Sequence, residues 1–186
     1  MEGDFDIECL PDHHSPNRTS IYGRRRMSID PREFRDTVGC FATGITIITT
    51  IDGDGGPVGL TANSFTSLSL DPPMVLFCLD RKVASFDAFQ TGAHFAVNIL
   101  ADGQTDTSNR FAKSGPEKWT GFEFDCWDTD CPILRGCLAN MECSVASIHE
   151  GGDHVIVIGE VTRMTHADGE TNPLLYYRGR YANLAP

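Results

Sequence analysis

The stretch 59-GLTANSFTSLSLDPPMVLFCL-79 is the part of the chain from which the remaining sequence is best interpreted. Its first half, up to Ser69, is rich in small and hydroxyl-bearing side chains, which let a backbone approach a ligand closely and offer it hydrogen bonds. A stop at residues 71–73 follows, and the apolar run 74–79 then predicts a core strand that anchors the segment. We therefore expect this stretch to form the rim of a binding site.

The composition limits the class of protein. A chain of 186 residues with 40% hydrophobic and 22% charged residues is typical of one globular domain with a substantial core. Its formal net charge of -11 argues against a nucleic-acid-binding surface, which needs a basic stripe. No apolar run approaches the roughly 18 residues of a membrane span, and the N-terminus lacks the apolar core of a signal peptide. We therefore expect no membrane partner and a cytoplasmic location.

The cysteines, seven in all, are spread along the chain without a C-x-x-C pair. Cys40 and Cys78 stand beside phenylalanines, so the pattern predicts reduced thiols in the core rather than disulfides. A metal site built from Cys126, Cys131 and Cys137 is the alternative, but these spacings differ from those of zinc knuckles. The sequence therefore predicts no metal site.

The N-terminal segment, residues 1–27, mixes acidic residues, adjacent histidines and a run of arginines without a sustained period. Such a segment is expected to be a flexible arm. The domain proper is then expected to occupy residues 28–186, beginning with a helix whose N-cap is Asp30. On that helix Phe34, Val38 and Phe41 would share one face, and Gly44 would follow its last turn.

Runs of β-branched and apolar residues predict most of the remaining structure. Strands are expected at 45–51, 58–63, 74–80, 94–100, 136–149 and 154–164. Turns are expected at 52–57 and 150–153, short helices at 83–90 and 104–112, and a long ordered loop with short elements at 113–135. Gly159 predicts a bulge or a close approach. Because the strands mostly follow one another, the pattern favours an antiparallel barrel or sandwich.

A candidate phosphate site follows the strand at 74–80. Arg81 and Lys82 stand at its end, and Ser85 falls in the first turn of the next predicted helix. Two cations and a hydroxyl beside a helix N-terminus can bind a phosphate, although an ordinary solvated strand end has the same residues. No GxGxxG follows a strand and no P-loop occurs, so neither kind of nucleotide site is indicated.

Several separated pieces occur in the order found in one protein family and cover about residues 28–182. They are 41-FATGITIIT-49, 59-GLTANSFTSLS-69, 71-DPP-73, 81-RKVAS-85, 98-NIL-100, 109-NRFA-112, 152-GDH-154 with Gly159, and 177-YRGRY-181. By these motifs the chain resembles the flavin reductase-like family. That family comprises small NAD(P)H:flavin oxidoreductase components that supply reduced flavin to two-component monooxygenases.

The resemblance implies a mainly β fold, a split β-barrel of antiparallel Greek-key type with a few short helices. It also implies a homodimer that binds FMN or FAD at the barrel edge. The flavin-facing positions that it implies are Thr61, Ala62, Asn63, Ser64, Ser67, Leu68 and Ser69. Hydroxyls and backbone amides there match the polar edge of the flavin ring, and the phosphate falls to the Arg81, Lys82 and Ser85 cluster.

The resemblance further implies a nicotinamide site beside the flavin. His154 occupies the Gly-Asp-His position, and we expect it to position the nicotinamide rather than to act as an acid or base, since hydride transfer to flavin needs no protein acid. Taken without the resemblance, a histidine at a strand start is an ordinary surface residue. Tyr177, Arg178 and Tyr181 would either close over the dinucleotide or pack the tail on the barrel.

The activity that the resemblance implies is reduction of free or loosely bound FMN or FAD by NADH or NADPH. The reduced flavin would pass to a separate flavin-dependent monooxygenase. Two alternatives are an enzyme that retains its flavin and reduces another acceptor, such as a corrinoid or ferric complex, and a barrel that binds flavin or haem without turnover. The sequence does not specify the flavin, the nicotinamide nucleotide, the acceptor or the role of residues 1–27.

Overall fold

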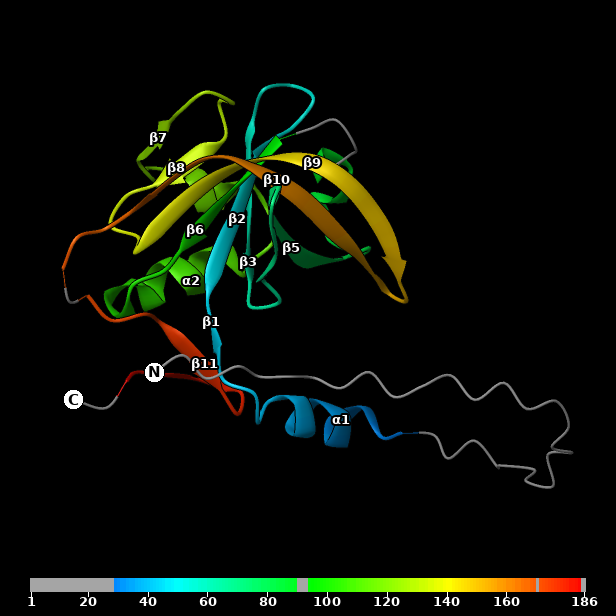
Figure 1. Cartoon of the computed structure of the whole chain (residues 1–186). Helices are drawn as coiled ribbons and strands as arrows, with labels where there is room; N and C mark the ends of the chain where they lie inside the picture. Colours follow the sequence, from blue (N-terminus) through cyan, green and yellow to red (C-terminus); the bar gives the residue numbers. More distant parts are fainter. Residues whose placement is uncertain (1–28, 90–93, 170, 185–186) are drawn as a thin grey trace, which may run out of the picture.

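The computed structural model describes residues 29–89, 94–169 and 171–184, and Figure 1 shows its arrangement. The predicted arm at 1–27 lies outside these ranges. The main sheet consists of β2 (Thr46–Ile51), β3 (Pro57–Ala62), β4 (Thr66–Leu70), β5 (Pro73–Asp80), β6 (His94–Ile99), β9 (Ala139–Gly151) and β10 (His154–His166). These strands pair in the order β3-β2-β6-β9-β10-β5-β4, and each pairing is antiparallel. The prediction of an antiparallel, mainly β fold is confirmed.

The strand β2 shows why a run of β-branched residues can lie in the core. Five of its six residues, from Thr46 to Thr50, are buried. Its hydroxyls are satisfied by backbone carbonyls of neighbouring segments, with Thr49 donating to Pro132 at 2.6 Å and Thr50 donating to His94 at 2.6 Å. A buried hydroxyl without a partner would be costly. The two threonine hydroxyls therefore link β2 to the backbone of β8 and β6.

The long hairpin of β9 and β10 crosses the whole barrel (Figure 1). The register between the two strands shifts at Ile158 and Gly159, which confirms the predicted bulge. A Cβ atom at Gly159 would stand only 2.4 Å from Cζ of Phe95, so the predicted close approach is present as well. Phe95 is fully buried and packs edge-to-face on Phe77, with ring centroids 5.2 Å apart. The missing side chain thus makes room for the aromatic core.

The strand β4 was not predicted, and it forms one edge of the sheet. It pairs with β5 after a turn at the predicted stop, residues 71–73. Residues 67–70 alternate between serine and leucine, but Leu68 and Leu70 are both exposed, so the strand has no buried face. The opposite edge is β3, and the barrel is therefore open between these two terminal strands.

Smaller elements surround the main sheet. A second sheet joins β1 (Thr43–Gly44), β11 (Leu175–Tyr177) and β12 (Arg180–Ala182), and a short hairpin joins β7 (Phe124–Cys126) and β8 (Pro132–Leu134). The helical elements are α1 (Pro31–Val38), α2 (Thr105–Phe111), and the 3₁₀ turns η1 (Phe86–Phe89), η2 (Asp102–Gln104) and η3 (Pro116–Trp119). The helix predicted at 83–90 is therefore a 3₁₀ turn over its described part. No helix within the described ranges is long and apolar enough to cross a membrane.

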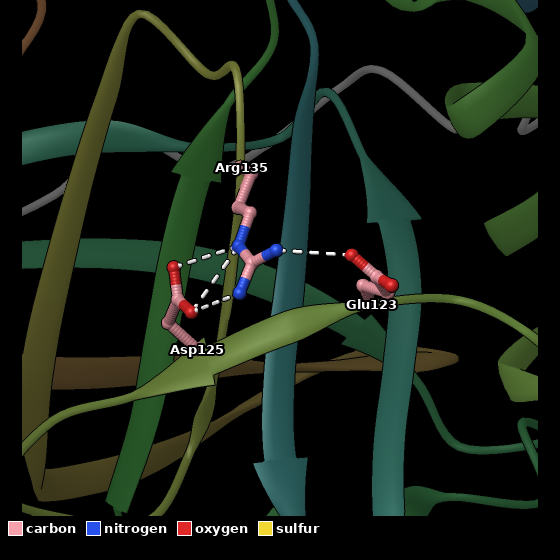
Figure 2. Close-up of polar contacts among 3 residues, drawn as sticks. All are labelled: Glu123, Asp125 and Arg135. Carbon is pink, nitrogen blue, oxygen red and sulfur yellow. Dashed lines mark hydrogen bonds and ion pairs between the residues drawn. The ribbon is translucent and has the colours of Figure 1, made fainter.

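The β7–β8 hairpin is fastened by exposed ion pairs (Figure 2). The Arg135 guanidinium donates to both carboxylate oxygens of Asp125 and, at 3.0 Å, to Glu123. This contact lowers the pKa of Asp125 below its usual range. The three residues stand outside the cleft described below, so we assign them to the hairpin rather than to a binding site.

Helix α1 begins as predicted but ends earlier. The Asp30 carboxylate accepts hydrogen bonds from the backbone of Arg32 and Glu33, both at 2.9 Å, as an N-cap should. The predicted end near Gly44 is wrong, because the helix stops at Val38 and the chain leaves to pair β1 with β11. Figure 1 shows α1 below the barrel, and none of its residues is buried.

The cysteines divide between core and surface. Cys131, Cys137 and Cys143 are buried thiols, as expected, whereas the prediction that Cys40 lies in the core is wrong. Cys40 follows α1, and its thiol lies 3.5 Å from the Asp36 carbonyl. Burial raises the pKa of Cys137 to about 11 and that of Cys143 to about 12. No group of His, Cys, Asp or Glu side chains suited to a metal ion comes together among the described residues.

Candidate functional site

A cleft of about 480 Å³ runs along the edge strand β3. This volume falls within the range of about 300–1,000 Å³ that is typical of small-molecule sites. Its walls are β3 and the residues after it, the end of β5 with the turn before η1, and the segment from α2 to η3. The lining residues fall in the ranges 57–64, 78–80, 83–85, 111–116 and 118–119, together with Asp52 and His154. The cleft therefore occupies the open side of the barrel.

Part of the predicted site is brought together in this cleft. Thr61 and Ala62 line it from the end of β3, and Asn63 and Ser64 line it from the turn after that strand. Ser85 lines it from the turn before η1, and His154 from the first position of β10. His154 stands opposite Asp80 in the pairing of β10 with β5, which explains how a residue so distant in sequence reaches the same cleft. Edge position leaves one side of the β3 backbone without a strand partner.

The hydroxyl groups along β3 are mostly used within the fold. Thr61 donates its hydroxyl to the Ser108 carbonyl of α2 at 2.7 Å. The Ser64 hydroxyl accepts from the Cys78 amide at 3.0 Å and donates to the Cys78 carbonyl at 3.2 Å. These contacts fix β3 between α2 and β5. The groups of this wall that remain available to a ligand are therefore chiefly backbone groups and the Asn63 side chain. The Asn63 amide makes only a long hydrogen bond, of 3.4 Å, to the Thr43 hydroxyl.

Ser67, Leu68 and Ser69 do not line the cleft. They lie on β4, where the register against β5 shifts between Ser67 and Ser69. Leu68 is 48% exposed, and Ser67 is exposed as well. The structure thus separates this triplet from Thr61–Ser64, although the two groups are close in sequence.

Arg81 and Lys82 also stand outside the cleft lining, whereas Ser85 lies within it. The Arg81 guanidinium forms an ion pair with Glu150 of the β9–β10 hairpin and lies 5.7 Å from the Phe86 ring centroid. Lys82 is exposed, and its backbone amide donates to the Asp80 carboxylate at 2.8 Å. Neither cation therefore lines the cleft.

His154 is oriented by its neighbour. Its Nδ1 lies 2.8 Å from the Asp153 carboxylate, and this hydrogen bond lowers the pKa of Asp153 below the ordinary aspartate range. An imidazole that donates through Nδ1 presents Nε2 as its other polar atom. With 41% of its side chain exposed, His154 is accessible at the mouth of the cleft.

The predicted tail residues pack elsewhere in this structure. The Tyr181 hydroxyl lies 3.0 Å from the Ser108 hydroxyl and donates to the Asn109 carboxamide oxygen at 2.8 Å, which ties β12 to α2. Arg178 has a positive φ of 49°, and its guanidinium lies 5.3 Å from the Tyr177 ring centroid. None of these tail residues lines the cleft.

The segment 111–119 supplies the wall that sequence reasoning missed. Gly59 permits its approach, since a Cβ atom there would stand 2.9 Å from the rings of Phe111 and Trp119. Lys118 donates to the Gly59 carbonyl at 2.8 Å and to the Phe111 carbonyl at 3.5 Å. Burial lowers the pKa of Lys118. Lys118 stands in the short turn η3, and the residues around it in sequence do not indicate that it would reach β3.

Fold and cleft together define an antiparallel barrel with a ligand cleft at its open edge. Residues 38–185 match the model of the flavin reductase like domain, and the chain belongs to this family. The predicted family and split-barrel fold are confirmed by this match and by the solved structures below.

Three comparisons show how near the relatives are. The chain is 45% identical over 159 residues to the flavin-dependent monooxygenase reductase subunit HsaB of Rhodococcus jostii, covering 86% of this chain and 80% of HsaB. Nitrilotriacetate monooxygenase component B from Mycobacterium thermoresistibile is 42% identical with a TM-score of 0.79, over 83% of this chain and 87% of that one. The Streptomyces globisporus NADH:FAD oxidoreductase SgcE6, solved with NAD and FAD fragments, is 33% identical with a TM-score of 0.78. This match covers 85% of this chain and 96% of the SgcE6 chain.

Proposed function

We propose that this chain is an NAD(P)H-dependent flavin reductase that supplies reduced FMN or FAD to a separate flavin-dependent monooxygenase. The observation that supports this most directly is the cleft along β3, which gathers Thr61–Asn63, Ser85 and His154 in a member of the flavin reductase-like family. The relatives named as a monooxygenase reductase subunit and as an NADH:FAD oxidoreductase point to the same activity.

The residues of the cleft suit a flavin. An isoalloxazine ring needs apolar contact on its faces and hydrogen-bond partners along its edge. Val83 provides apolar surface, and the backbone of Thr61–Asn63, at the end of β3 and just after it, provides amides and carbonyls. Ser85 provides a hydroxyl for the ribityl chain or the phosphate. We propose that Ser67, Leu68, Ser69, Arg81 and Lys82 act at the periphery of this site.

The bound flavin and nicotinamide supply the hydride chemistry between them. The chain holds the two in register and excludes water. We propose that His154, fixed through Nδ1 by Asp153, accepts a hydrogen bond from the nicotinamide carboxamide at Nε2. His154 then sets the position of the nicotinamide without exchanging a proton with it. Tyr177, Arg178 and Tyr181 are proposed to support α2 and the cleft wall, with Tyr181 acting through Ser108.

Steady-state oxidation of NADH and NADPH, each with FMN, FAD and riboflavin, tests the proposal. We expect flavin-dependent oxidation that is faster with one nicotinamide nucleotide than with the other. His154→Ala should raise KM for the nicotinamide and leave flavin affinity unchanged. Absence of flavin-dependent oxidation with all six combinations would refute the reductase. Gel filtration then distinguishes exchangeable flavin, which leaves the protein colourless, from the retained flavin of the alternative enzyme class.

We further propose that the chain assembles as a homodimer through α1. Phe34 is 54% exposed and Val38 is 51% exposed on a helix of only eight residues. Helices this short are marginal in water unless an apolar face is packed. A second copy covering this face would supply that packing. Sedimentation of the wild type and of Val38→Asp tests it, with a dimer expected for the first and a monomer for the second; a monomeric wild type refutes the dimer.

A further inference from the structure

Lys118 is a cation of the cleft wall that lacks a carboxylate partner in the part of the chain that the structure describes. Arg81, Arg135 and Arg163 each form an ion pair, whereas the Lys118 ammonium contacts two backbone carbonyls, those of Gly59 and Phe111. An ammonium has three N–H donors. At least one of them is therefore left for a group in the cleft that Lys118 lines.

The surroundings of Lys118 make this arrangement informative. The side chain is partly buried, and burial disfavours its charged form, which is why its pKa is lowered. A partly desolvated cation is stabilised when an anion binds beside it. Lys113 lines the same cleft and adds a second positive charge, and Ser85 adds a hydroxyl from the other wall.

The carboxylates of the cleft are occupied by backbone amides. Asp52 accepts from Asp54 at 3.0 Å and from Gly56 at 2.7 Å, and Asp80 accepts from Lys82 at 2.8 Å. Within the described ranges neither aspartate forms an ion pair with Lys118. In a chain with a net charge of -11, the cleft lining has two lysines, Lys113 and Lys118, to balance its two aspartates, and within the described ranges neither lysine forms an ion pair.

We propose that Lys118, supported by Lys113 and Ser85, binds a phosphate group of the nucleotide in this cleft. The proposal rests on the proposed reductase function and adds the residue that selects phosphorylated ligands. It moves the principal positive charge of the phosphate site from Arg81, whose charge is already paired with Glu150, to the segment 113–118. The phosphate belongs either to the flavin or to the nicotinamide dinucleotide, and the experiment distinguishes these two sources.

The experiment compares FMN with riboflavin, which has the same ring and no phosphate. Dissociation constants are measured by flavin fluorescence quenching for the wild type, Lys118→Met and Lys118→Arg. Arg135→Met, which removes a cation from outside the cleft, is the matched control. A charge-assisted hydrogen bond corresponds to roughly a 10- to 100-fold change in affinity. We expect Lys118→Met to weaken FMN by that factor, to leave riboflavin unchanged, and Lys118→Arg to restore most of the FMN affinity.

The measurements with riboflavin show whether Lys118 binds the phosphate or only supports the structure of the cleft. If Lys118→Met only loosens β3 by losing the contact to Gly59, FMN and riboflavin weaken equally, and the proposal is wrong. If the preference for FMN is unchanged but KM for NADH rises with riboflavin as acceptor, the phosphate is that of the dinucleotide, and the proposal holds. If neither the preference nor KM changes, the proposal is refuted while the reductase stands. A wild type that binds neither flavin refutes the reductase and this proposal together.

Discussion

Replacing Gly159 with alanine should destabilise the barrel from within. A Cβ atom there would stand 2.4 Å and 2.5 Å from Cζ and Cε1 of Phe95 and 3.0 Å from Cβ of Cys143. Phe95 is fully buried and packs on Phe77, so its ring has little room to withdraw. Overpacking of this kind costs about 1–3 kcal/mol. For a domain of this size the melting temperature should fall by roughly 2–4 °C per kcal/mol.

The measurement is urea unfolding of Gly159→Ala at constant ligand concentration, together with its thermal midpoint. The slope of the unfolding free energy against urea should stay the same, since the native surface barely changes. Gly151→Ala is the matched control, because its Cβ would meet neighbours in the same hairpin only at 3.4 Å or beyond. We expect the control to be close to the wild type in stability.

A double variant tests the assigned cause. Phe95→Leu removes ring atoms from the clash, so Gly159→Ala should cost less in the Phe95→Leu background than in the wild type. Two results would contradict the reasoning. One is equal stability of the Gly159→Ala and Gly151→Ala proteins, and the other is strict additivity in the double variant.

The other expected outcomes concern the tail, a core thiol and the neighbour of the cleft histidine. Tyr181→Phe removes the hydroxyl contacts to Ser108 and α2, and should lower the unfolding free energy by about 1 kcal/mol in calorimetry; no change would show that the tail is not fastened there. Burial raises the pKa of the Cys137 thiol from 9.0 to about 11, so the folded state holds that proton more tightly. The associated stability is complete below pH 9 and is lost as the pH rises through 11, by roughly 2–3 kcal/mol. Cys137→Val should therefore lose less stability than the wild type between these pH values, and equal slopes would contradict this. The His154 hydrogen bond lowers the pKa of Asp153, so its contribution is present above the ordinary aspartate pKa and is lost as the pH falls through the lowered value. NMR titration should find Asp153 below the ordinary range in the wild type and back within it in His154→Ala, and an unchanged titration would exclude the contact.

The strands were predictable wherever a strand has a buried face. The β-branched run of β2 and the apolar run of β5 have five and three buried residues respectively, and such burial leaves a periodic trace in the sequence. β4 has no buried residue, and it was missed. The end of α1 was missed for a different reason, since β1 leaves the helix to pair with β11, which is more than 130 residues further along the chain.

The candidate site was predictable where position along one strand determines it. Thr61–Ser64 reach the cleft because they share the edge strand β3 and the turn after it. The role of Arg81 depends on Glu150, a partner 69 residues away, and the contact of Lys118 with Gly59 spans 59 residues. Contacts between residues so far apart in sequence cannot be predicted from the residues around each partner. Only the ordered family motifs linked His154 with the β3 segment before the fold was known.

The open edge of the barrel has a consequence for how the protein behaves outside its complexes. A terminal strand such as β3 presents unpaired backbone groups, and unpaired edges are templates for intermolecular pairing and aggregation. On the other edge, Leu70 is 93% exposed and adds an apolar surface. A ligand seated along β3 would shield one of these edges and stabilise the native state by mass action. Purification and storage with flavin should therefore preserve the protein against precipitation better than buffer alone.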